Sequence, residues 1–345
     1  MAAVQHLLDL KPAELAAWLA ERGLPGYRAA QIRRWPIQSP GIDFDGMSDL
    51  PKALRGQLAE SFQLWTMSQV ARQQSDDGTE KLLLEVAGGD RIECVLLRDQ
   101  RGHRTVCLST QVGCAMGCVF CASGLDGVRR NLTAGEILEQ ALRLKSLLAG
   151  GERLSHVVVM GMGEPLANLP ALLAALETVT AGEGLAISAR RVTISTVGLP
   201  KGIRQLAESG VQYHLAVSLH APDDGLRSQI VPANRHVGIA AILAATDDYF
   251  ARTGRRVTFE YVLLAGVNDR QEHALRLAAL LKGRPSLVNL IPYNPVAGLP
   301  FQTPDPGRVR RFEETLEAGG VAVKTRYRKG NRIDAACGQL RRSRA

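Results

Sequence analysis

Three cysteines fall within eight residues, at Cys114, Cys118 and Cys121, in the spacing C-x3-C-x2-C. Thiolates are soft ligands that iron–sulfur clusters and zinc both favour. Three neighbouring cysteines can bind three irons of a cubane and leave the fourth iron open, whereas structural zinc requires four protein ligands. Cys107 and His103 are the available fourth ligands. The spacing therefore favours an iron–sulfur cluster, with structural zinc as the alternative.

Composition and charge indicate where the protein works and which kinds of partner it binds. The chain has no apolar run approaching the ~18 residues of a membrane span, and Met1–Leu10 lacks a signal-peptide pattern. We therefore expect a soluble cytoplasmic protein that binds no membrane and keeps its thiols reduced. The chain is basic, with 42 Lys+Arg against 34 Asp+Glu, and the excess gathers at Lys324, Arg326, Arg328, Lys329, Arg332, Arg341, Arg342 and Arg344. This cluster can neutralise nucleic-acid phosphates, or it can be a solvated basic tail.

The elements that position these residues begin with a helical accessory domain, expected at residues 1–70. Apolar residues recur at helical spacing over Pro12–Glu21, Arg28–Trp35 and Asp49–Phe62. Pro36 is expected to end the second of these helices early. Alternating, β-rich patterns then predict a β-rich connector over residues 71–103.

Beyond residue 104, short β-branched runs alternate with helical patterns as far as residue 340, and residues 341–345 form a basic tail. The expected strands are His156–Met160, Arg191–Ser195, Tyr213–Leu219, Val257–Leu263, Leu287–Ile291 and Val321–Tyr327. Repeated βα units indicate an α/β fold in which parallel strands close into a full or partial barrel. Polar residues gather where the strands end, which is where such barrels carry their chemistry.

Several motifs occur in order along the chain: STQVGC at Ser109–Cys114, VMGMGEPL at Val159–Leu166, VTIST at Val192–Thr196, VSLHAP at Val217–Pro222, NLIP at Asn289–Pro292 and IDAACGQL at Ile333–Leu340. The cysteine run, with an aromatic residue before its third cysteine, resembles the radical S-adenosylmethionine (SAM) superfamily. Together the motifs resemble the RlmN/Cfr family of RNA methyltransferases, from about Leu24 to Leu340. The resemblance implies a partial (β/α)6 radical SAM barrel with a small N-terminal helical domain and a short β extension.

The resemblance also implies the cofactors. Cys114, Cys118 and Cys121 would hold a [4Fe-4S] cluster whose open iron binds SAM, and the reduced cluster would split SAM to a 5′-deoxyadenosyl radical. Matching the family motifs places SAM contacts at Gly163, Glu164, Ser195, Ser218, Leu219, His220 and Asn294. Taken alone, a serine or histidine at one of these positions would usually be structural.

Three further residues match catalytic positions of the family. Cys337 matches the cysteine that carries the methyl group, and Cys107 matches the cysteine that resolves the protein–RNA link by forming a disulfide. Glu93 matches the base that removes a proton from the adenine. The alternatives are a buried core thiol for Cys107 and a solvent-facing strand carboxylate for Glu93. Cys94 has no family counterpart and is interpreted as a strand residue.

The implied activity is methylation of carbon 2 of a specific adenosine in 23S rRNA, with tRNA as a further candidate substrate. The close alternative is carbon-8 methylation, as in Cfr. Two other classes remain open: a zinc-bearing RNA-binding module that is no enzyme, and a radical SAM enzyme with another substrate. An electron donor such as flavodoxin or ferredoxin is an expected partner. Asn331-Arg332 replaces an acidic pair common in RlmN proteins, which adds positive charge beside the C-terminal motif.

Overall fold

The computed structural model describes residues 5–326 and 333–341. The expected basic residues Arg328, Lys329, Arg332, Arg342 and Arg344, the Asn331-Arg332 replacement and most of the basic tail lie outside the described residues. Among the helices of the described ranges, none combines the length and the apolar character that a membrane span requires.

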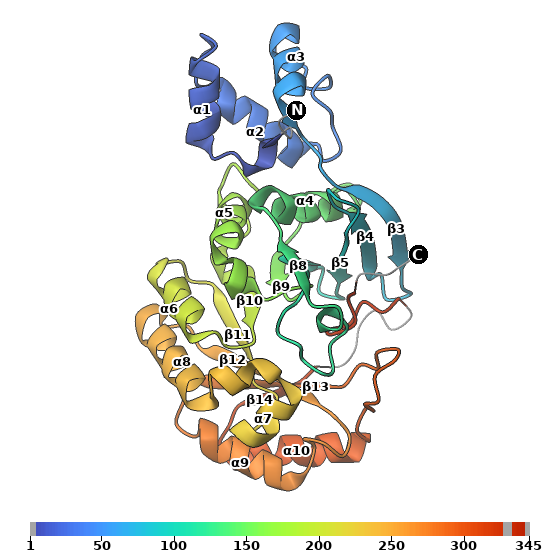
Figure 1. Ribbon diagram of the computed structural model, residues 1–345, viewed down its shortest axis with the longest axis vertical. Helices are drawn as coiled ribbons and strands as arrows, with labels where there is room; N and C mark the ends of the chain where they lie inside the picture. Colours follow the sequence, from blue (N-terminus) through green and yellow to red (C-terminus); the bar gives the residue numbers. More distant parts are fainter. Residues whose placement is uncertain (1–4, 327–332, 342–345) are drawn as a thin grey trace.

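The N-terminal part is a small helical unit with its own core (Figure 1). Its helices are α1 (Pro12–Ala20), α2 (Arg28–Gln38) and α3 (Lys52–Ser61), and the short strands β1 (Gln5–His6) and β2 (Phe62–Gln63) pair in parallel. The core of this unit is made by apolar residues spaced along one face of each helix, among them Leu15, Leu19, Ile32, Leu54 and Leu58. The expected accessory domain is therefore present in outline.

The expectation that Pro36 ends its helix was wrong. Helix α2 continues to Gln38, with Pro36 inside its last turn, and the Ser39 backbone N–H still bonds to the Trp35 carbonyl at 2.9 Å. Proline removes one helical hydrogen bond because it lacks an N–H. Pro36 and Ile37 are both buried, and we infer that this burial offsets the lost bond.

The rest of the chain is built around one ten-stranded sheet in the order β14-β13-β12-β11-β10-β9-β6-β5-β4-β3. Its strands are β3 (Ser68–Gln74), β4 (Glu80–Glu85), β5 (Arg91–Arg98), β6 (Arg104–Cys107), β9 (His156–Val159), β10 (Val192–Thr196), β11 (His214–Ser218), β12 (Val257–Leu263), β13 (Ser286–Pro292) and β14 (Val323–Thr325). Strands β6 and β9 to β14 pair in parallel, whereas β3, β4 and β5 extend the sheet in antiparallel fashion. The expected partial barrel with a β extension is confirmed.

Helices cover the outer face of this sheet (Figure 1). They are α4 (Ala134–Lys145), α5 (Leu169–Thr180), α6 (Pro200–Glu208), α7 (Asp224–Ile230), α8 (Ile239–Thr253), α9 (Gln271–Leu281) and α10 (Pro306–Ala318), with 3-10 turns η1 (Leu7–Asp9), η2 (Ala122–Gly124), η3 (Pro165–Asn168), η4 (Ala189–Arg191) and η5 (Pro232–His236). A separate hairpin of β7 (Gln111–Gly113) and β8 (Val128–Asn131) frames the cysteine run. The helices place the sheet's apolar face in one large core and leave the loops at the strand ends to build the site.

Helix α4 connects the N-terminal unit to the barrel. It begins with a capping box in which Thr133 and Glu136 each satisfy the other's backbone N–H. Its buried Glu139 carboxylate accepts hydrogen bonds from the backbone N–H of Thr66 at 2.9 Å and of Met67 at 3.1 Å. These bonds join the segment that leaves the accessory unit to the helix that follows the cysteine run.

Candidate functional site

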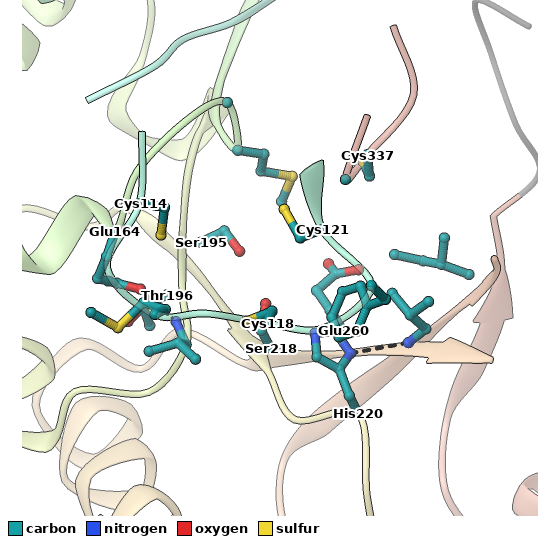
Figure 2. A pocket seen from close by; sticks show the side chains of 18 of the residues that line it. Cys114, Cys118, Cys121, Glu164, Ser195, Thr196, Ser218, His220, Glu260 and Cys337 are labelled. Atoms are coloured by element: carbon teal, nitrogen blue, oxygen red, sulfur yellow. Dashed lines mark hydrogen bonds between the residues drawn. The ribbon is translucent and has the colours of Figure 1, made fainter. Parts of the chain in front are cut away.

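A cavity lies at the carboxyl ends of the parallel strands and brings most of the predicted site residues together (Figure 2). Its walls come from the cysteine run and from the loops that follow β9, β10, β11 and β13. Ten predicted residues line it: Cys114, Cys118, Cys121, Gly163, Glu164, Ser195, Ser218, His220, Asn294 and Cys337. We call it the first cavity.

The cysteine loop, residues 114–121, is held open by its backbone. The Cys114 N–H bonds to the Gly127 carbonyl at 3.0 Å, and the Val119 N–H bonds to the Ile230 carbonyl at 3.0 Å. Gly113 begins the loop with φ +80°, and a Cβ at this position would lie 2.0 Å from the Gly127 oxygen. Only glycine allows this approach, and it directs the three thiols that follow into one space (Figure 2).

The three thiols have the surroundings of metal ligands. Burial raises the pKa of Cys114 to about 11 and raises the pKa of Cys118 and of Cys121 as well. The neighbouring cysteines add to the rise for Cys114 and Cys118. These three half-buried thiols line one cavity, and they need a cationic partner to become thiolates. The irons of an iron–sulfur cluster are such a partner.

The fourth ligands that zinc would need lie elsewhere. Cys107 and His103 are absent from the residues that line the first cavity. His103 Nδ1 instead lies 2.8 Å from the Asp99 carboxylate, and its ring meets the His156 ring edge-on. Neither Cys107 nor His103 therefore completes a four-coordinate zinc site with the cysteine loop.

Glu164 places a buried carboxylate beside the cysteine loop. Its oxygens accept hydrogen bonds from the backbone N–H of Leu166 at 3.0 Å and of Val197 at 2.7 Å. Burial raises the pKa of this carboxyl, and the two backbone bonds oppose the rise. Gly163 has φ +104°, and a Cβ there would lie 2.7 Å from the Gln111 Cβ. The Gly163-Glu164 turn is therefore packed against β7 and holds one orientation.

His220 is fixed as a neutral imidazole. Its Nδ1 accepts a hydrogen bond from the Val262 N–H at 3.0 Å (Figure 2), so the ring proton resides on Nε2. Burial, with Arg227 as a second cause, lowers the pKa of His220 to about 3. The ring meets Phe120 edge-on at 4.8 Å, which locks its position behind the cysteine loop.

Cys337 reaches the first cavity on a strap formed by residues 333–341. The strap is tied to the cysteine loop because the Ala122 N–H bonds to the Gly338 carbonyl at 2.8 Å and the Ser123 hydroxyl to the Leu340 carbonyl at 2.6 Å. The Asn294 side chain donates to the Cys337 carbonyl at 3.2 Å. These three bonds hold the strap in place, and Cys337 is exposed at the wall of the first cavity.

Glu93 lies outside the first cavity, on β5, and is buried, so the alternative of a solvent-facing carboxylate is wrong. One of its oxygens pairs with the Lys81 ammonium at 2.8 Å, and the other accepts from the Arg341 N–H at 2.8 Å. Lys81 also donates to the Asp334 carbonyl at 3.3 Å. Burial raises the pKa of Glu93, and Lys81 opposes the rise. Both ends of the strap are therefore anchored to this ion pair.

Cys107 is a buried thiol on β6, opposite Val95 of β5. Burial raises the pKa of Cys107 to about 12, and the Cys337 thiol contributes to the rise. The expected disulfide is nevertheless not formed, since all six cysteines are free. Cys107 is held in a strand and Cys337 on the strap, so the two sulfurs are not at bonding distance.

Like Glu93 and Cys107, Leu219 does not line the first cavity, and two charged residues near it were missed. Leu219 is part of the apolar core, and only its backbone serves the site, accepting from the Arg227 side chain at 3.0 Å. The missed residues are Arg227, which is buried and donates to the backbone carbonyls of Val197 and Ser218, and Glu260, which lines the first cavity. A signal existed for Glu260, because it is the one charged residue in the apolar strand Val257–Leu263.

Comparison with known proteins agrees with this geometry. The family model of the radical SAM superfamily matches residues 108–278, and that of the ribosomal RNA large subunit methyltransferase N-terminal domain matches residues 5–64. A probable dual-specificity RNA methyltransferase RlmN from Rhodopirellula baltica is 57% identical over 98% of this chain and 91% of its own length. Its counterpart from Symbiobacterium thermophilum is 48% identical over the same shares.

A solved structure extends the likeness to the whole fold. The crystal structure of a radical SAM methyltransferase from Sphaerobacter thermophilus superposes with a TM-score of 0.95 at 46% identity, covering 98% of this chain and 100% of the other. The cavity with its three thiols lies within the matched residues. The chain belongs to the RlmN family of radical SAM RNA methyltransferases.

Proposed function

We propose that this protein methylates carbon 2 of an adenosine in 23S rRNA, and of an adenosine in tRNA, by way of a methyl group carried on Cys337. The observation that carries the proposal is the strap: it holds an exposed thiol at the wall of the cavity that contains the three cysteines. The dual-specificity name of the relatives supports the pair of substrates. Carbon 2 of adenine is electron-poor and no nucleophile, so transfer to it needs radical chemistry.

The cofactors of the superfamily are a [4Fe-4S] cluster and SAM, which together supply the radical. Cys114, Cys118 and Cys121 would hold the cluster through thiolates. The remaining groups would bind SAM, which carries an ammonium, a carboxylate, a ribose diol and an adenine. The proposed contacts are Gly163, Glu164, Ser195, Ser218, the Leu219 backbone, His220 and Asn294. The Glu164 carboxylate suits the ammonium group, and the neutral His220 presents only an N–H.

Cys337 would carry the methyl group and deliver it to the base. Once the base is attached to this cysteine, Glu93 would accept the proton that leaves when the aromatic ring is restored. Its buried position and raised pKa suit a general base that works near neutral pH. Cys107 would release the product: its sulfur would attack the Cys337 sulfur, and the bond from Cys337 to the methylene carbon on the base would break. That carbon would keep the electron pair and take a proton to become the methyl group. This step requires the strap to move toward β6. An electron donor such as flavodoxin or ferredoxin would reduce the cluster, and we place the reaction in the cytoplasm.

The test is a methylation assay with identification of the nucleoside. The anaerobically reconstituted protein is incubated with SAM, a reductant and a protein-free 23S rRNA fragment or tRNA, and the digested RNA is analysed by mass spectrometry. The expected product is 2-methyladenosine. Recovery of 8-methyladenosine would show that carbon 8 is methylated instead of carbon 2. Absence of any methyladenosine would contradict the proposal.

A further inference from the structure

A second cavity extends from the amino ends of several parallel strands to the loop that follows β13 and to the strap. It has a volume of about 490 Å³ and is roomier than the first, which has about 160 Å³. Its walls include residues at the amino ends of three strands: Thr105 is the second residue of β6, and His156 and His214 are the first residues of β9 and β11. The volume falls in the range of about 300–1,000 Å³ typical of ligand sites, so it can receive a group as large as a nucleoside.

The two cavities share part of their walls. Ile291, Asn294 and Cys337 line both of them. The exposed Cys337 therefore lies at the boundary between the cavity that contains the three cysteines and the second cavity. A substrate entering by the second cavity reaches Cys337 without passing through the space of the cysteine loop.

The second cavity is strongly basic. Arg190 and Arg191, in the 3-10 turn that leads into β10, line it and are exposed. Within the described part of the chain, neither of them forms an ion pair. Arg326 lines the inner wall, where the Cys337 thiol, Glu260 and Cys107 hold the pKa of its guanidinium above the usual value. Asp99 is the single carboxylate among the lining residues, and it faces His103 at 2.8 Å.

The two histidines of this cavity are suited to a base rather than to a phosphate. Burial lowers the pKa of His156, with His103 and Arg191 as further causes. Burial and the neighbouring Arg255 and Arg256 lower the pKa of His214. Both imidazoles are therefore neutral near pH 7 and offer flat aromatic faces, on which unstacked RNA bases commonly rest.

We propose that the second cavity is the entrance for RNA: a splayed-out adenosine enters past His156 and His214 to Cys337, while Arg190 and Arg191 hold its flanking phosphates. This inference rests on the proposed function and adds the route and the residues that recognise the nucleic acid. Exposed unpaired arginines at the mouth of a cavity bind phosphates by releasing counterions. Neutral aromatic walls deeper inside then receive the base, and the arrangement selects single-stranded or looped RNA because a paired base cannot enter.

The experiment compares two pairs of neighbouring arginines in the full-length, cluster-loaded protein. Arg190→Ala/Arg191→Ala removes the proposed phosphate contacts. Arg310→Ala/Arg311→Ala removes the same charge from two exposed residues on the outer face of α10 and is the matched control. Binding of a fluorescein-labelled, protein-free 23S rRNA fragment is measured by anisotropy over a series of salt concentrations. Iron content and the thermal midpoint establish that both variants are intact.

The expected result is a change in the salt dependence. Losing two phosphate contacts lowers the slope of log K against log salt by about 1.4, which corresponds to roughly fourteen-fold weaker binding at ~0.15 M salt when affinity at 1 M is unchanged. The control should bind within about two-fold of the parent protein. Binding by Arg190→Ala/Arg191→Ala with the parent's slope and affinity would overturn the inference, even if the parent methylates RNA. If Arg190→Ala/Arg191→Ala weakens RNA binding as expected but the parent forms no methyladenosine, the proposed function fails while the role of these arginines in RNA binding stands.

Discussion

Replacing Lys81 by methionine removes the cation that faces the proposed base. The Lys81 ammonium lies 2.8 Å from the Glu93 carboxylate, and the two side chains are only 8% and 4% exposed. The second oxygen of Glu93 keeps its bond from the Arg341 N–H. Methionine retains most of the length and volume of the lysine stem, so the substitution removes mainly the charge.

The magnitude follows from the distance and the burial. Two unit charges this close interact by roughly 6 kcal/mol at an effective dielectric constant of about 20, before the cost of desolvating both is subtracted. Opposite charges at such distances lower a carboxyl pKa by about one to three units. Burial already raises the pKa of Glu93 and Lys81 opposes that rise, so removing Lys81 must raise the pKa further. The upper limit corresponds to about 4 kcal/mol, close to the ~3–5 kcal/mol lost when a buried ion pair is broken on one side.

A base must be deprotonated to work, so the variant should need a higher pH. We expect the acidic limb of the pH–rate profile for methyladenosine formation to move up by about one to three pH units in Lys81→Met.

The free energy of unfolding of Lys81→Met should also depend on pH, because the pKa of Glu93 in the folded protein is raised. A carboxyl whose pKa is raised in the folded state costs nothing below its unfolded pKa, and the cost grows as pH rises through the folded pKa. The variant's deficit in unfolding free energy should therefore be small in acid and larger at neutral pH.

The assay measures the initial rate of methyladenosine formation over a pH series at saturating SAM and RNA. Lys282→Met, which removes an exposed lysine at the end of α9, is the matched control and should keep the parent's profile. A Lys81→Met profile that superimposes on the parent's would refute the reasoning, because the group that sets the acidic limb would then not feel Lys81.

Other changes have simpler outcomes. Cys337→Ala should abolish RNA methylation and change the unfolding free energy by less than about 0.5 kcal/mol, because the side chain is exposed; methylation in this variant would exclude the methyl-carrier role. Gly163→Ala should lower the unfolding free energy by roughly 1–3 kcal/mol in a urea titration, because alanine strains a φ of +104° and meets the Gln111 Cβ at 2.7 Å; a parent-like midpoint would contradict this. Cys118→Ala should lose the bound iron and the brown colour, whereas Cys94→Ala, whose thiol lies in the core, should keep both by metal analysis.

The strands and helices of the barrel were predictable because their patterns are local. Runs such as Val257–Leu263 are apolar and β-branched, and the structure has strands there and helices between them. Strand β3 was missed because Ser68–Gln74 is polar and almost fully exposed. Such an edge strand owes its place to backbone pairing with β4 rather than to its side chains. Pro36 was misjudged for a similar reason, since its burial within the fold outweighs its local preference.

The sequence by itself indicated the chemistry of the cysteine run, because three soft ligands within eight residues are typical of a metal centre. It also placed polar residues at the ends of strands, which a parallel sheet brings to one edge. Only the tertiary structure decided that the strap anchors to Glu93 and Lys81 and presents Cys337 between two cavities. The residues concerned are more than 240 positions apart, and no local pattern records a contact over that separation. Long-range packing alone places the thiol at the wall of both cavities and anchors its strap to the buried carboxylate.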